Sequence, residues 1–166
     1  VRVVAVEPAN CPSLTKGKYA YDFGDTGQMT PLVKMHTLGS SFVPPSSHAG
    51  GLRYHGMAPL VSQLVDLGQV EPTAYSQTEC FEAGVTFAKA EGILPAPEAN
   101  HAVKGALVEA MRCKEEGESQ AALLNLCGRI HFDMQAYMDY SAGKLEDHPY
   151  DESEVAMALA GLPSVA

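Results

Sequence analysis

The sequence lacks tryptophan, an excess of basic residues and any long apolar run. Its 166 residues include 7 Tyr and 5 Phe but no Trp, so a platform for stacking nucleic-acid bases is poorly supplied. Only 11 Lys and Arg stand against 20 Asp and Glu, which gives a net charge of −9. A protein that binds a phosphate backbone normally presents a basic face, and a membrane-spanning helix needs about eighteen consecutive apolar residues. The composition therefore indicates neither nucleic acid nor membrane as a partner.

The familiar motifs of metal, phosphate and hydrolase sites are also missing. The four cysteines are widely and irregularly spaced, with no CxxC pair, which argues against a zinc ribbon. We interpret them as reduced thiols of a cytoplasmic protein. The six histidines show no recognised ligand spacing, and no GxGxxG, GxxxxGK[ST] or GxSxG motif occurs.

Short apolar segments alternate with helical patterns along the chain. Strands are expected over 3–6, 70–75 and 121–126, with a further possible strand over 19–23 in an otherwise irregular stretch that ends near residue 56. Apolar spacing predicts helices over 57–67, 78–91, 98–116 and 133–141. This alternation is typical of an α/β fold in which helices cover both faces of a parallel sheet, and ligands then bind at the carboxyl ends of the strands. The acidic stretch 146–154 predicts a solvated tail.

Two segments carry unusual groups of residues. The first, 48–56, places three glycines among bulky polar residues, which favours a loop whose backbone closely approaches another group. The second, 91–101, uses a proline-rich turn to place Glu98 and His101 in the first turn of a helix. The simpler interpretations are a set of structural turns for the first segment and a carboxylate that caps its own helix for the second.

These segments resemble the carboxyl-terminal portion of the tryptophan synthase beta chain family, pyridoxal-phosphate (PLP) enzymes of fold type II. The resemblance covers residues 1 to about 145, a carboxyl-terminal domain fragment followed by the acidic tail 146–166. The residues at 21–26, 42–45 and 48–56 are similar to those of the second, alpha-independent branch of these beta chains, which argues against an alpha partner. The matching stretches read VEP (6–8), AGGLRY (49–54), EGILPAPE (91–98) and LNLCG (124–128).

The resemblance implies a cytoplasmic lyase of tryptophan biosynthesis that joins L-serine to indole, with PLP as the electron sink. Glu98 matches the family's glutamate beside the cofactor ring. Cys127 matches the residue facing the pyridine nitrogen, commonly Ser, and Gly128 lets the backbone pass close to the ring. Tyr54 and Gly56 match backbone carbonyls that bind a monovalent cation.

Two positions depart from the family pattern. Arg53 stands where the common branch has an Asp that meets the serine side chain, so we expect an anionic substrate group such as that of phosphoserine. Ile130 stands where the family usually has a glycine near the ring.

The family's Schiff-base lysine and its glycine-serine-asparagine phosphate loop match no segment of this sequence. We therefore expect the isolated chain to be inactive, as part of a longer parent enzyme. We also expect a homo-oligomer, because the first strand would otherwise expose an apolar edge. The alternatives are a threonine synthase or serine dehydratase relative and a free-standing, non-catalytic α/β module that binds a small metabolite or a partner chain.

Overall fold

The computed structural model describes residues 1–128, 131 and 133–165, and Ile130 therefore lies outside the described residues. The chain forms two compact units, which are described separately. The first comprises residues 1–46, 52–74 and 148–166, and the second comprises residues 47–51 and 75–147. Within the described ranges, no helix is both long and apolar enough to cross a membrane.

Two of the expected strands pair with each other in the first unit. Strand β1 (Val4–Pro8) lies beside β4 (Glu71–Tyr75). The amide of Glu71, at the start of β4, donates to the carbonyl of Val3, just before β1 (3.0 Å). Because the two starts meet, the strands run parallel.

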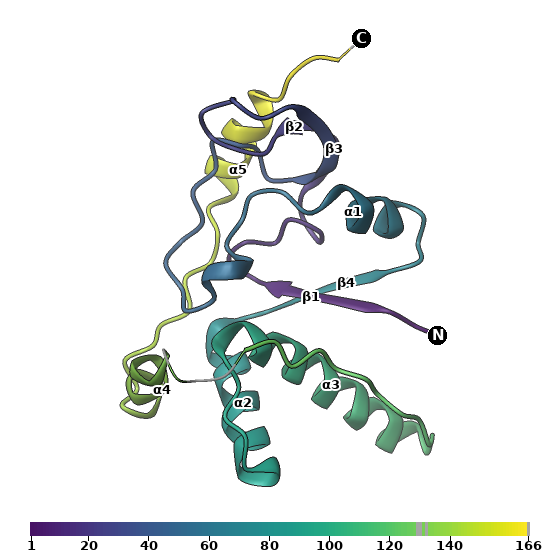
Figure 1. Cartoon of the computed structure of the whole chain (residues 1–166), viewed down its shortest axis with the longest axis vertical. Helices are drawn as coiled ribbons and strands as arrows, with labels where there is room; N and C mark the ends of the chain where they lie inside the picture. Colours follow the sequence, from purple (N-terminus) through teal and green to yellow (C-terminus); the bar gives the residue numbers. More distant parts are fainter. Residues whose placement is uncertain (129–130, 132, 166) are drawn as a thin grey trace. The chain divides into compact units, whose positions relative to one another are not determined.

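A second strand pair occupies the stretch that was expected to be mostly irregular. Strand β2 (Lys18–Phe23), which was expected, pairs antiparallel with β3 (Leu32–Thr37), which was not, so that Lys18 faces Thr37 and Phe23 faces Leu32 (Figure 1). In β3 the inward positions are Val33, Met35 and Thr37. The sequence did not reveal β3, because polar residues alternate with the apolar ones in this segment and glycine and proline surround it.

The acidic tail predicted for 146–166 is not wholly solvated. Within it, helix α5 (Glu152–Ala160) begins at Asp151, whose carboxylate accepts the amides of Ser153 and Glu154. Val155 and Ala158 are buried in one cluster with Cys11, Leu38 and Phe42. The acidic residues cap the start of α5 or face solvent, while apolar residues pack on its other side. Charge alone therefore did not predict the structure of this segment. The first unit also contains helix α1 (Pro59–Asp66), as expected. A short 3₁₀ turn spans Gly50–Leu52.

The second unit contains the three remaining helices, and all three were predicted with small shifts at their ends. They are α2 (Gln77–Glu91), α3 (Pro97–Glu116) and α4 (Met134–Ser141). Ser76 caps α2, in a reciprocal capping box with Glu79. Phe81 of α2 packs against Ala136 and Tyr137 of α4 in the core of this unit.

The apolar run 121–126 does not form a strand. It has no regular secondary structure, and most of its residues are exposed, Leu123 fully so. A strand needs a neighbour to satisfy its backbone hydrogen bonds, and in the described residues neither of the two sheets includes this segment.

Candidate functional site

Glu98 lies in the first turn of α3 and faces the glycine pair of the 48–56 segment. Its Oε1 accepts a hydrogen bond from the amide of Gly51 (3.3 Å). A Cβ added to Gly50 or Gly51 would lie 3.9 or 3.8 Å from the Glu98 side chain. Ala96 caps α3 without any side-chain hydrogen bond, so the structure does not support the interpretation that Glu98 caps its own helix. The two segments singled out in the sequence therefore meet at this half-buried carboxylate.

Gly128 brings the third predicted segment to the same helix start. Its carbonyl accepts the amide of Ala96 at 3.5 Å, a long hydrogen bond. Gly128 has a φ of +82°, and an added Cβ would lie 3.1 Å from Cβ of Ala96. Only glycine adopts this backbone without strain. Cys127, directly before it, is an exposed free thiol.

Buried polar groups lie just behind this helix start. The Tyr137 hydroxyl oxygen lies 2.7 Å from the carbonyl oxygen of Pro95 and 2.9 Å from Oδ1 of Asn100, so its single proton is shared between these two acceptors. Nδ1 of His101 lies 3.1 Å from the carbonyl of Pro97, and burial lowers the pKa of this imidazole. Because a carbonyl only accepts, Nδ1 carries the proton, and Nε2 is a buried nitrogen without a hydrogen-bond partner.

The remaining predicted residues lie in the first unit, on a segment that adds to the end of β3. Thr37 and Gly56 form an antiparallel bridge, in which the amide of Leu38 donates to the carbonyl of His55 (2.8 Å). The hydrogen bonds of this bridge leave the carbonyl of Gly56 facing away from β3. A side chain at Gly56 would meet Sδ of Met35 at 2.3 Å. Backbone carbonyl oxygens are ligands that suit a hard monovalent cation.

One nitrogen of the Arg53 guanidinium has a hydrogen-bond partner in the protein, and another has none. Its Nη2 donates to the carbonyl of Pro44 (2.9 Å), while Nε is buried and has no hydrogen-bond partner. An unpaired buried donor carries a free-energy cost, which an anionic ligand could remove.

Two residues near Tyr54 were not identified from the sequence. The Cys11 thiol donates to the carbonyl of Tyr54 (3.2 Å), and burial raises its pKa to about 12, so it remains a donor at neutral pH. His55 is 5% exposed and its Nε2 lies 2.8 Å from the carbonyl of Phe23. Its position within the glycine-rich segment was the only signal in the sequence, whereas Cys11 gave none.

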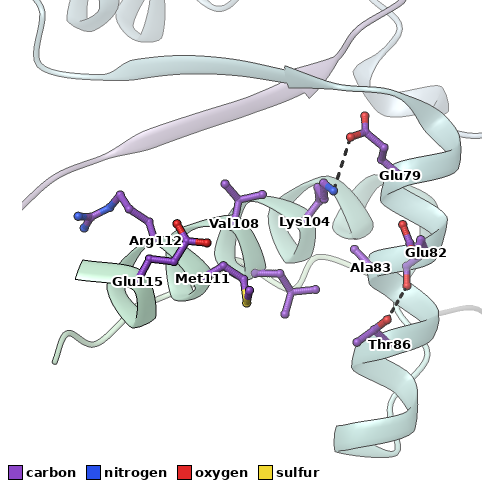
Figure 2. A pocket seen from close by; sticks show the side chains of 10 residues that line it. Glu79, Glu82, Ala83, Thr86, Lys104, Val108, Met111, Arg112 and Glu115 are labelled. Atoms are coloured by element: carbon purple, nitrogen blue, oxygen red, sulfur yellow. Dashed lines mark hydrogen bonds and ion pairs between the residues drawn. The ribbon is translucent and has the colours of Figure 1, made fainter. Parts of the chain in front are cut away.

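The second unit also contains a groove of about 460 Å³ between α2 and α3 (Figure 2). Ala83, Val108 and Met111 line it, and the ion pair of Lys104 with Glu79 (3.6 Å) lies at one end. None of the residues predicted for the site lines this groove. Among residues 1–128, 131 and 133–165, no cluster of three or more His, Cys, Asp or Glu side chains could hold a metal ion.

Comparison with known proteins identifies the relatives of this chain. It is 58% identical over 147 residues to a tryptophan synthase beta chain 2 from Aquifex aeolicus, a match of 89% of this chain and 34% of the relative. The corresponding protein of Methanosarcina mazei is 57% identical over 145 residues, and a tryptophan synthase beta chain of Thermococcus onnurineus is 54% identical over 158 residues. The chain spans about a third of the length of these relatives, which agrees with the portion expected from the motifs. No protein-family model matches the chain.

A solved structure confirms the α/β fold class. A fungal L-serine ammonia-lyase from Rhizomucor miehei matches 87% of this chain and 42% of its own, with a TM-score of 0.60 at 16% sequence identity. At that identity the likeness shows the fold alone.

Proposed function

We propose that this chain, which is homologous to the tryptophan synthase beta chains over most of its length, supplies one wall of the PLP pocket of such an enzyme. The parent enzyme would join L-serine, or an activated serine, to indole and release L-tryptophan and water or the activated leaving group. Sequence identity of 54–58% to these relatives supports the assignment. The observation that carries it is that three motif segments meet at the start of α3: Gly51 donates to Glu98, and Gly128 lies against Ala96.

The residues at this helix start fit one side of a flat, nitrogen-containing cofactor. PLP, when bound, would supply an electron sink for loss of the serine β-substituent. Glu98 offers a carboxylate beside the ring, which can hold or release a proton there. Cys127 offers a thiol toward the ring nitrogen. A thiol is a weak donor, so it would leave that nitrogen unprotonated. Gly128 presents bare backbone, which permits close approach.

Arg53 would select the serine substrate by its charge. A guanidinium pairs strongly with phosphate, and the Arg53 Nε lacks a hydrogen-bond partner within the protein. We therefore assign Arg53 to a phosphoserine-like leaving group.

The carbonyls of Tyr54 and Gly56 would hold a monovalent cation. The Gly56 carbonyl faces away from β3 and so remains available to a ligand, which supports this role, whereas the His55 carbonyl accepts the amide of Leu38. The Tyr54 carbonyl oxygen has two lone pairs. The Cys11 thiol, 3.2 Å away, occupies one of them, and the other remains available to a cation.

The isolated chain is expected to be inactive, because no lysine in it matches the family's cofactor-linking motif. The parent would be a cytoplasmic homo-oligomer that needs no alpha partner. The exposed side chains of Val3 and Val4 on β1 (47% and 38%) are consistent with such further contacts.

The absorbance of PLP tests whether this chain forms part of a PLP pocket and needs the rest of the parent enzyme to bind the cofactor. The isolated chain should leave the visible spectrum of added PLP unchanged. A chimera in which residues 1–145 replace the matching part of the Aquifex aeolicus beta chain 2 should bind PLP and shift that spectrum. A chimera that folds as a compact protein and yet fails to bind PLP would contradict the proposal.

A further inference from the structure

His55 is anchored by both its side chain and its backbone within the segment 53–56. The imidazole is 5% exposed, and its Nε2 lies 2.8 Å from the carbonyl of Phe23 at the end of β2. A carbonyl only accepts, so the ring donates from Nε2. The carbonyl of His55 accepts the amide of Leu38. One residue thus joins the segment to the ends of both β2 and β3.

A fully buried carboxylate lies next to this imidazole. Asp22 is 0% exposed, and its Oδ2 accepts the Thr37 hydroxyl (2.7 Å) and lies 4.0 Å from Nε2 of His55. Its other oxygen accepts the amide of Phe23 (2.8 Å). Burying a carboxylate costs free energy unless donors surround it. Thr37 also pairs with Gly56, so Asp22, Thr37, Gly56 and His55 form a closed ring of contacts.

We infer that His55 is the positioning residue of the segment 53–56, and that its anchorage holds the carbonyls of Tyr54 and Gly56, the proposed cation ligands, in place. The inference deepens the proposed cation site and rests on it. A hydrogen bond from Nε2 to β2 fixes the rotation of the segment about its own axis. Without that bond the Thr37–Gly56 bridge, a single bridge outside the strands, is left with its backbone contacts alone. His55 touches no ligand in this account and acts through its neighbours.

Two substitutions separate anchorage from simple loss of a buried side chain. In His55→Gln the amide nitrogen reaches nearly the position of Nε2 and can still donate to Phe23. His55→Phe keeps the volume but has no donor. His36→Phe is the matched control, because His36 lies on β3 and neither of its ring nitrogens has a hydrogen-bond partner. If His55→Phe does not fold, His55→Asn takes its place, since its shorter amide does not reach Phe23.

Hydrogen exchange of the Leu38 and Met57 amides, measured on the chain itself, reports the anchorage. Loss of the Nε2 bond should speed their exchange by about tenfold in His55→Phe, while His55→Gln and His36→Phe stay near the wild-type rates. Equal exchange in the wild type and in His55→Phe would overturn the inference.

The thermal midpoint in KCl, compared with choline chloride at equal ionic strength, reports the cation. The wild-type chain and His55→Gln should gain stability with K⁺, and His55→Phe should lose most of that gain. A K⁺ response that His55→Phe retains in full would also overturn the inference. A wild-type chain with no response to K⁺ would instead contradict the proposed cation site, and hydrogen exchange would still decide the role of His55 in holding the segment.

Discussion

At the scale of single residues, the proposed chemistry depends on a few side chains whose surroundings are unusual. Arg53 is the clearest case, because one of its nitrogens is buried without a protein partner. In the chimera, Arg53→Lys should keep part of the preference for phosphoserine over serine, because it keeps the charge. Arg53→Asp should lower that preference by at least about tenfold, because it repels phosphate. Tryptophan formation with each substrate measures the ratio, and an unchanged ratio in Arg53→Asp would rule out this role.

His101 predicts how stability depends on pH. Burial, the largest influence, lowers the pKa of the folded imidazole from 6.5, and the backbone hydrogen bond to Pro97 opposes it only in part. Below about pH 6.5 the unfolded chain therefore binds a proton that the folded chain does not, and the free energy of unfolding falls as the pH falls. Urea denaturation at several pH values should show a shallower fall in His101→Gln. The exposed His148 gives the control His148→Gln, and a pH profile identical to wild type in His101→Gln would disprove the prediction.

Replacing Gly128 should lower the free energy of unfolding, and the same replacement at a second glycine provides the comparison. Gly128 and Gly117 both have positive φ, +82° and +69°, but an added Cβ contacts Ala96 only at Gly128. Replacement of either by Ala should cost about 1 kcal/mol for the left-handed backbone. Gly128→Ala should cost more, because Ala96 must also move. Urea denaturation of the two variants measures the difference, and equal losses would show that the contact with Ala96 is unimportant.

At the scale of elements, the close approach of α2 and α3 depends on Gly84. A Cβ at Gly84 would lie 2.1 Å from Oδ1 of Asn100, a fully buried side chain. Ala is normally the better helix former, by about 1 kcal/mol, so an isolated α2 would gain from Gly84→Ala. We predict the opposite in the protein: Gly84→Ala should lower the free energy of unfolding.

The double variant Gly84→Ala/Asn100→Ala provides the control. Removing the amide makes room for the new methyl group, so the cost of Gly84→Ala should be smaller in the Asn100→Ala background. Denaturation of the four proteins of this cycle measures the coupling. Strictly additive losses would show that Asn100 is not the obstacle.

Helices were predictable from the sequence because capping residues and terminal glycines are local signals. Gly92 and Gly117 end α2 and α3 at left-handed positions. Strands were less predictable, because a strand also needs a neighbour. Polar residues hid β3, and the apolar run 121–126 has no strand beside it. The candidate site followed the same division: motifs predicted Glu98 and Gly128, whose segments meet in the structure, but the contacts of His55 and Cys11 depend on the folded chain.

At the scale of the whole molecule, the central claim is that this chain contributes one wall of a catalytic pocket whose covalent anchor belongs to the rest of the parent. The chain matches about a third of the length of its curated relatives, and three of its four motif segments meet at the start of α3. An enzyme assembled from this chain and the remaining two thirds of a relative should therefore regain the whole reaction.

Tryptophan formation by the chimera of residues 1–145 with the Aquifex aeolicus beta chain 2 is the most direct measurement. With indole and serine or phosphoserine, the chimera should form tryptophan, its Glu98→Gln variant should be at least about a hundredfold slower, and the isolated chain should form none. A chimera that binds PLP but makes no tryptophan from either substrate, or tryptophan formation by the isolated chain, would contradict the account.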